Sequence, residues 1–304
     1  MILKRLQEGK SQRASSQQQR FGELRSITNT TTRSMGWDLA GCFRNFNGCF
    51  GLLAASAISV ASPFVCAAAE APVSEAAPTV IELFTSEGCS SCPPADRLLS
   101  ELSRDKRRSV IALSEHVDYW DYLGWKDPNS SRAFSDRQNL YAHKMRLASV
   151  YTPQVVVNGV AEAVGNNRAS IEDAISKTVD ERLKRLLVRC QLSPDRRSVK
   201  IEVEPFPLAR ATNAFIANLA LTADGVRSKV VRGENSGHTL LHDNVVVKLS
   251  SQAVSQPTFA QSGLHSLIAV PDNIDLIKTK VVVFFQDPGQ GRIFAAGIGY
   301  PTAR

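Results

Sequence analysis

The sequence lacks three motifs that would assign common chemistries. It has no glycine-rich loop that could cradle a phosphate, no Gly-x-Ser-x-Gly segment and no His-Glu-x-x-His helix. These absences argue against nucleotide use, serine hydrolysis and zinc-protease chemistry. Cysteine is also scarce, and only Cys89 and Cys92 have the spacing of a motif. This pair is therefore the leading candidate for chemistry.

Most of the chain also lacks an excess of positive charge, although the formal net charge is +7. Residues 1–69 contain eight Lys or Arg and three Asp or Glu, so 28 of the 36 basic and 26 of the 29 acidic residues lie beyond them. The remaining part is nearly neutral. The composition therefore gives no reason to expect nucleic-acid binding.

The first 77 residues have the pattern of an export signal. Residues 1–34 show no apolar periodicity, and we expect a disordered or non-translated extension, with Met35 as an alternative start. Residues 35–69 contain a basic residue, an apolar run and small residues, which is typical of a signal peptide, and 70–77 is an Ala/Pro/Glu linker. We expect cleavage, no stable membrane span afterwards, and a periplasmic or extracellular location. A retained membrane anchor is the alternative.

Residues 78–187 alternate between strand and helix patterns, which favours an α/β domain. The expected strands are 79–84, 110–114, a strand that starts at Thr152-Pro153, and 161–164, which returns after an Asn158-Gly159 hairpin turn. The expected helices are 95–102, 132–145 and 170–187.

Residues 188–304 contain strand patterns and little helix, which predicts an all-β antiparallel sandwich-like domain. The expected strands are 188–192, 199–203, 214–221, 229–232, 244–249, 264–270, 279–285 and 293–298.

The chemistry of the cysteine pair follows from its place before a helix. A thiolate at a helix N-terminus is stabilised by the free N–H groups and the helix dipole, so Cys89 is the expected nucleophile. Cys92 is one turn away and is the expected resolving thiol. This hypothesis requires that the sulfur of Cys89 is accessible.

An X-Pro pair follows the cysteines by about sixty residues and begins a Val-rich strand. Proline is the one residue whose cis form costs little, and it has no backbone N–H. Thr152 and Pro153 are therefore expected to hold the backbone of an extended substrate.

Three segments carry a family resemblance: Ile81–Asp96, His116–Trp120 and Tyr151–Gln154. Together they resemble a secreted, thioredoxin-like bacterial family of unknown function, over roughly residues 77 to 300. The resemblance implies a thioredoxin-like fold and a Cys-x-x-Cys site, and no substrate. The expected fold class is thus an α/β thioredoxin-like domain followed by an all-β antiparallel sandwich-like domain.

Other side chains have more than one interpretation. Glu82 is either a proton shuttle or a structural carboxylate on the opposite face of the sheet. His116 could complete a Cu(I) site with the two cysteines, or lie in a groove. Tyr119 and Trp120 either line a substrate groove or cover the core. His242 lies in an expected loop, where zinc binding is disfavoured.

The function expected from these features is an exported thiol–disulfide oxidoreductase that uses no cofactor and no metal. Its partner would be a protein or small-molecule thiol or disulfide. A non-catalytic binding or scaffold protein with a structural disulfide, or a Cu(I)-handling protein, is the alternative. The pattern gives neither the substrate nor the oligomeric state.

Overall fold

Strand-forming residues dominate the part of the chain that the structure, a computed structural model, describes: residues 77–180, 182–208, 213–272 and 274–303. The helices are α2 (Pro93–Arg104), α3 (Arg132–Met145), α4 (Arg168–Thr178) and α5 (Gln256–Ser262), with 3-10 helices η1 (Asp118–Leu123) and η2 (Leu276–Lys278). The strands are β1 (Thr79–Thr85), β2 (Val110–His116), β3 (Gln154–Val157), β4 (Ala161–Val164), β5 (Lys184–Arg185), β6 (Val188–Leu192), β7 (Ser198–Val203), β8 (Ala214–Ala223), β9 (Val226–Lys229), β10 (Thr239–His242), β11 (Val245–Ser255), β12 (Leu264–Ala269), β13 (Thr279–Gln286) and β14 (Ile293–Gly299).

The expected signal peptide, linker and N-terminal extension lie outside the described residues. Among the residues that are described, no helix has the length and apolarity needed to cross a membrane.

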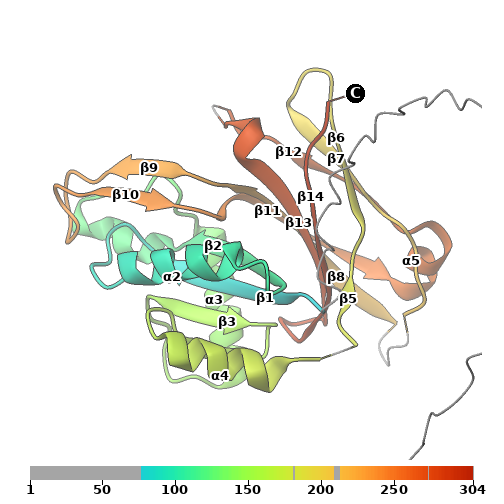
Figure 1. The fold of residues 1–304 in the computed structure, drawn as a ribbon, viewed down its shortest axis with the longest axis horizontal. Helices are drawn as coiled ribbons and strands as arrows, with labels where there is room; N and C mark the ends of the chain where they lie inside the picture. The colour runs from blue at the N-terminus through green and yellow to red at the C-terminus, as the bar shows by residue number, and fades with distance from the viewer. Residues whose placement is uncertain (1–76, 181, 209–212, 273, 304) are drawn as a thin grey trace, which may run out of the picture. The chain divides into compact units, whose positions relative to one another are not determined.

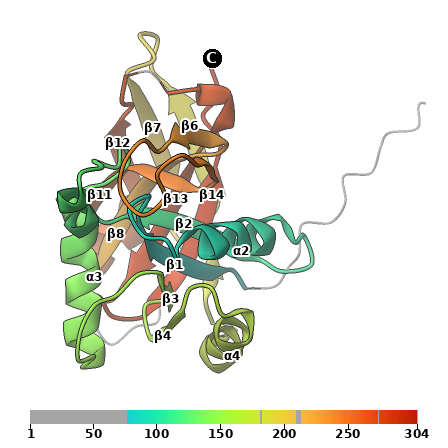
Figure 2. The same ribbon diagram turned by 90° about the vertical axis from the view of Figure 1, so that its left-hand side faces the viewer.

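Helices cover both faces of the sheet around β1. Successive side chains of a strand point to opposite faces. Ile81 and Leu83 pack against α2 and α4, whereas Phe84 packs against Tyr141 of α3. Figure 2 shows α3 on one side of β1 and β3, and α2 and α4 on the other. This arrangement places the N-terminus of α2 at the end of β1.

Strands from both halves of the sequence join one nine-stranded mixed sheet, in the order β4-β3-β1-β2-β11-β8-β13-β14-β5. β1 and β2 are parallel, and β11, β8, β13 and β14 are antiparallel neighbours. A three-stranded sheet, β12-β7-β6, and the β9–β10 hairpin are separate (Figure 1). The expected fold class, an α/β thioredoxin-like domain followed by a sandwich-like domain, is therefore wrong. The protein is mostly β and is built on a shared sheet.

The physical reason is that β8 and β13 are buried on both faces. Leu219 and Val283 point into a core that includes the three-stranded sheet, α5 and a cluster of phenylalanines. Ala220 and Phe284 point the other way and pack with Leu113 of β2. In a separate sandwich, each sheet would bury only one apolar face. Here β8 and β13 bury a second apolar face, which packs on strands from the first half of the chain.

Most strand and helix positions agree with the sequence pattern, and α4 is the main difference. The predicted helix 170–187 ends at Thr178, where the Thr178 hydroxyl donates to the carbonyl of Ala174. Leu186 then donates its N–H to Ala296 of β14. The chain therefore leaves the helix after Thr178 and joins the sheet at β5, with Val179 and Leu187 exposed. A period near 3.6 in so short a segment did not distinguish a helix from this arrangement.

The shared sheet predicts that residues 77–187 do not fold alone. A fragment that ends at residue 187 loses the apolar partners of Leu113 and exposes the edge of β2. We expect weak near-UV circular dichroism and no cooperative urea unfolding for this fragment, against cooperative unfolding for the whole chain. A fragment that unfolds cooperatively would contradict the importance of the shared core.

Candidate functional site

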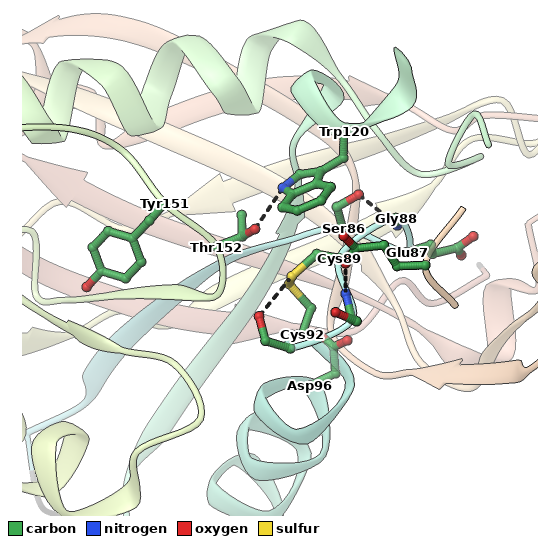
Figure 3. Close-up of a disulfide and its surroundings, with 12 residues drawn as sticks. Ser86, Glu87, Gly88, Cys89, Cys92, Asp96, Trp120, Tyr151 and Thr152 are labelled. Atoms are coloured by element: carbon green, nitrogen blue, oxygen red, sulfur yellow. Dashed lines mark hydrogen bonds between the residues drawn. A yellow bond between two sulfur atoms is a disulfide. The ribbon is translucent and has the colours of Figure 1, made fainter. Parts of the chain in front are cut away.

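The cysteine pair lies at the junction of β1 and α2. Cys92 is the N-cap residue of α2, with prolines in the first turn, and its carbonyl accepts hydrogen bonds from Ala95 and Asp96. Cys89 and Cys92 form a disulfide with their Cα atoms 5.4 Å apart (Figure 3). The position before a helix agrees with the sequence pattern, and it would stabilise a thiolate in the reduced state.

Both sulfur-bearing residues are buried, which the sequence did not predict. Cys89 is 1% exposed and Cys92 is 0% exposed, whereas Ser90 and Ser91 between them are exposed. The expectation of an accessible Cys89 is therefore wrong. The disulfide lies directly beneath the surface and is covered by neighbouring segments.

The loop between β9 and β10 covers the cysteine pair. Its Asn235 donates from Nδ2 to the carbonyls of Glu87 and Cys89, at 2.8 and 2.9 Å. Its Glu234 accepts a hydrogen bond from the N–H of Ser90 at 2.9 Å. These residues lie more than 140 positions from the cysteines along the chain, so a search for short motifs could not find them.

Trp120 and Thr152 border the pair on another side (Figure 3). Trp120 Nε1 donates to Thr152 Oγ1 at 2.8 Å. A Cβ on Gly88 would lie 3.1 Å from Cβ of Trp120, so the indole packs closely on the cysteine loop. Both Trp120 and Thr152 are partly exposed. They form a ledge beside the disulfide.

Pro153 is next to α2, as the sequence analysis expected. The Thr152–Pro153 peptide bond is cis. A Cβ on Gly165 would lie 3.0 Å from Cβ of Pro153 and 3.3 Å from Cβ of Ala95, which is in the first turn of α2. The structure therefore brings Thr152, Pro153 and Trp120 together with the cysteine pair.

Three buried ionisable side chains lie beside the pair. His242 of β10 is 3.5 Å from a carboxylate oxygen of Glu87 and 3.5 Å from one of Asp96. Burial alone would lower the pKa of His242, but the two carboxylates outweigh it and raise this pKa from 6.5 to about 10. Neither ring nitrogen of His242, nor Asp96 Oδ1, makes a hydrogen bond within the described part of the chain. We call these three residues the His242 cluster.

His116 lies in the same buried region, and its ring contacts Asp127 and His242. Its Nδ1 lies 2.7 Å from Asp127 Oδ2, and its ring makes an edge-to-face contact with His242 at 4.9 Å. Burial raises the pKa of Asp127, but His116 more than offsets this and the pKa is lowered overall. The His116 side chain is therefore paired with Asp127 in this buried polar region.

Glu82 lies on the opposite face of β1, as strand alternation predicts. It accepts hydrogen bonds from Arg137 Nε and Tyr141 Oη, at 2.6 and 2.5 Å. Burial and the nearby Glu82 raise the pKa of Glu115 well above its usual value. The structure thus places Glu82 in a buried ion pair between β1 and α3, and does not bring it to the cysteines.

Tyr119 also faces away from the pair. Its hydroxyl donates to Gln138 Oε1 at 3.0 Å, and burial raises its pKa to about 12. Nor do the described residues contain a group of three His, Cys, Asp or Glu side chains arranged to hold a metal ion. The placement of His116 and Tyr119 therefore supports neither a copper site nor a groove built on Tyr119.

The sequence analysis missed Glu87, Asp96, Asn235 and His242 as site residues. Glu87 and Asp96 flank the cysteine motif, and their signal was an acidic residue on each side of an otherwise uncharged segment. His242 and Asn235 could not be found this way, because the segment that contains Gly233, Gly237 and His242 was expected to be a loop and the pairing of β10 was unknown.

The site therefore consists of a covered disulfide with an aromatic ledge on one side and buried charges on another. Residues 80–286 match the family model described as "Protein of unknown function (DUF1223)", and the chain belongs to this family. A search of curated proteins gave no match.

Two solved structures are similar. The crystal structure of protein AGR_C_4864 from Agrobacterium tumefaciens has 26% identity, a TM-score of 0.54, and a match over 74% of this chain and 94% of its own. HBP35 of Porphyromonas gingivalis has 13% identity, a TM-score of 0.54, and a match over 74% of this chain and 76% of its own. The second likeness concerns the fold alone.

Replacing Asn235 by Ala should make the disulfide easier to reduce. The change removes both hydrogen bonds to the cysteine loop, and each contributes about 1 kcal/mol. We expect reduction by dithiothreitol to become roughly 30-fold faster, since the two bonds together contribute about 2 kcal/mol and about 1.4 kcal/mol corresponds to a factor of ten. Thiol trapping and mass spectrometry measure the rate.

The matched control is Ser236→Ala, whose hydroxyl donates to the Val231 carbonyl in the same loop and away from the cysteines. It should leave the rate unchanged. Equal rates for the Asn235→Ala protein and the wild type would show that the loop does not limit access.

The His242 cluster predicts a pH-dependent stability. A folded-state pKa above the unfolded value means that the stabilisation is full below about pH 6.5 and is lost as the pH rises toward 10. Over this window the free energy of unfolding should fall by at most about 1.4 kcal/mol per pH unit from this group. Urea unfolding at several pH values measures it.

His242→Gln should remove this slope, while His265→Gln, at an exposed histidine that faces Glu202, should retain it. The same slope in all three proteins would mean that His242 does not hold its proton more tightly in the folded state.

Proposed function

We propose that the chain is an exported thiol–disulfide oxidoreductase in which Cys89 and Cys92 alternate between a disulfide and two thiols. Cys89, which precedes Cys92 at the helix N-terminus, attacks the sulfur of a substrate disulfide. Cys92 then resolves the mixed disulfide. The substrates are protein or small-molecule disulfides and thiols.

The observation that carries this proposal is the burial of the His242 cluster beside the disulfide. A bridge between residues three positions apart stabilises a fold by about 2 kcal/mol or less in the chain-entropy account. Burying ionised side chains costs several kcal/mol each unless they are well paired. Asp96 and His242 keep polar atoms without hydrogen bonds in the described structure, so this arrangement is poor as a purely stabilising device. Buried charges of this kind are typical of sites whose chemistry moves protons.

Substrate access would follow the release of Asn235 from the cysteine loop. The contacts that cover Cys89 from this side are polar, and water can replace them. An extended substrate would then lie along Thr152 and Pro153 beside Trp120. The cis peptide bond and the partial exposure of Thr152 and Trp120 support this role.

The burial of both sulfurs favours a second candidate function. In this alternative the disulfide is structural, and the protein binds a partner without turnover. The two functions differ in one measurable property, which is whether the pair exchanges with another disulfide while the protein remains folded.

Export is also part of the proposal. It rests on the signal-peptide pattern of residues 35–69 and on the disulfide itself, because disulfides persist in oxidising compartments. Such a compartment, the periplasm or the extracellular space, would supply disulfide substrates.

Insulin reduction with dithiothreitol and refolding of scrambled ribonuclease test the activity. We expect the wild type to accelerate at least one reaction, and Cys89→Ser to lower the rate roughly 100-fold because the nucleophile is lost. The control is Cys190→Ala, since Cys190 is buried and its pKa is raised to about 12. Failure of the wild type in both assays, with the pair demonstrably reduced, would refute the oxidoreductase and favour the structural bridge.

A further inference from the structure

The geometry around α2 points to a specific proton acceptor for the cysteine pair. Asp96 lies four residues after Cys92, so the two side chains share one face of the helix (Figure 3). Asp96 is 6% exposed, and its Oδ1 has no hydrogen-bond partner in the described structure. A buried carboxylate oxygen without a donor is open to a hydrogen bond from a nearby group.

The other oxygen of this carboxylate is held by a side chain from the far end of the sequence. Oδ2 of Asp96 lies 3.5 Å from Nδ1 of His242, while Nε2 of His242 lies 3.5 Å from Glu87. Glu87 is fixed in turn by Trp125, whose Nε1 donates to it at 2.8 Å. The groups that face His242 are therefore Glu87 after β1, Asp96 on α2 and His116 on β2, which itself pairs with Asp127.

A groove between α2 and β10 gives this cluster its own access to solvent. The groove has a volume of about 400 Å³ and is lined by both Asp96 and His242. Arg97, Ser100 and Thr239 also line it. Neither cysteine lines the groove, so it reaches the carboxylate by a path separate from the cysteine loop. Asp96 is 6% exposed and lines this groove although its Oδ1 is itself buried, so the groove is the side from which the carboxylate is nearest to water.

We propose that Asp96 accepts the proton of Cys92 when the mixed disulfide resolves, that His242 positions the Asp96 carboxylate, and that the proton leaves through the groove between α2 and β10. This inference rests on the proposed oxidoreductase function. It assigns one residue as an acid–base group and one as a positioning residue for that reaction.

The chemical step balances as follows. Reduced Cys89 first attacks a substrate disulfide, forms a mixed disulfide and releases one substrate thiolate. The thiol of Cys92 then transfers its proton to Asp96, and the resulting thiolate attacks the sulfur of Cys89. The bond between Cys89 and the substrate breaks, and the second substrate thiolate leaves. The cysteine pair is oxidised by two electrons, and the substrate disulfide is reduced to two thiolates. Asp96 then returns its proton to water.

A chromogenic disulfide, dithiobis(nitrobenzoate), separates the two steps because each releases one coloured thiolate. The first release reports attack by Cys89, and the second reports resolution by Cys92. In a stopped-flow experiment on the reduced full chain, we expect Asp96→Asn to leave the first release unchanged and to slow the second about 100-fold near neutral pH. Each protein carries alanine at the other cysteine positions of the chain, namely Cys42, Cys49, Cys66 and Cys190.

Two further variants distinguish proton transfer from a structural effect. Asp96→Glu keeps a carboxylate and should restore most of the second release, and raising the pH should rescue Asp96→Asn because hydroxide can remove the proton. His242→Gln should shift the pH midpoint of the second release while the first is unaffected. The control is Asp173→Asn, an exposed acid on α4 that pairs with Lys177, which should behave as wild type.

A second release that is equally fast in Asp96→Asn and wild type would overturn the inference and leave the oxidoreductase standing. The same conclusion follows if Asp96→Asn and Asp96→Glu are equally slow with no rescue at high pH, since the role would then be structural. If the wild type gives no second release at all, the proposed function itself fails, and the inference fails with it.

Discussion

The site depends on the pairing of β2 with β11 at the middle of the large sheet. The N–H of Ser114 donates to the carbonyl of Asn244 at 2.8 Å, and Ser114 is opposite Val245 in register. β10 ends only two residues earlier, at His242. This pairing therefore fixes His242 against His116 at the end of β2 and carries the preceding loop over the cysteine pair. A sheet that ended at β2 would leave the disulfide uncovered and Asp96 without its cation.

Buried ionisable side chains form two groups near β1, one that faces α3 and one that adjoins the cysteine pair. On the face of α3, Glu82 is paired with Arg137 and accepts a hydrogen bond from Tyr141, whereas Glu115 lies 3.7 Å from Arg137 and neither of its carboxylate oxygens makes a hydrogen bond in the described structure. On the other side, the His242 cluster holds its charges at 3.5 Å and leaves polar atoms without hydrogen bonds in the described structure. Both buried groups are therefore incompletely hydrogen-bonded in the described structure, and the His242 cluster is the one that adjoins the cysteine pair.

Sequence periodicity predicted most of the elements because strands and helices reveal their buried faces locally. The helix 132–145 and the strand 188–192 agree with α3 and β6 in full. The Cys-x-x-Cys pair and Thr152-Pro153 were found because their chemistry depends on short spacing and on proline itself. The order of the strands in the sheet was not predicted, because the pairing of β2 with β11 joins residues about 130 positions apart through a single register pair. His242 and Asn235 were missed for the same reason, because their partners are distant in the chain and the strand pairing was unknown.

The cover over Cys89 and the groove beside Asp96 together explain how a buried disulfide could still react. Covering the sulfur with an apolar side chain would make opening costly, since each buried large side chain contributes about 1.5–3 kcal/mol. Asn235 instead holds the backbone of the cysteine loop, through hydrogen bonds to the carbonyls of Glu87 and Cys89 whose net contribution is about 1 kcal/mol each, because water replaces them when they break. In the proposed reaction, the proton would leave separately through the groove that Asp96 and His242 line. A substrate that seals the cysteine side would therefore exclude water from the sulfurs without trapping the proton that the reaction must release.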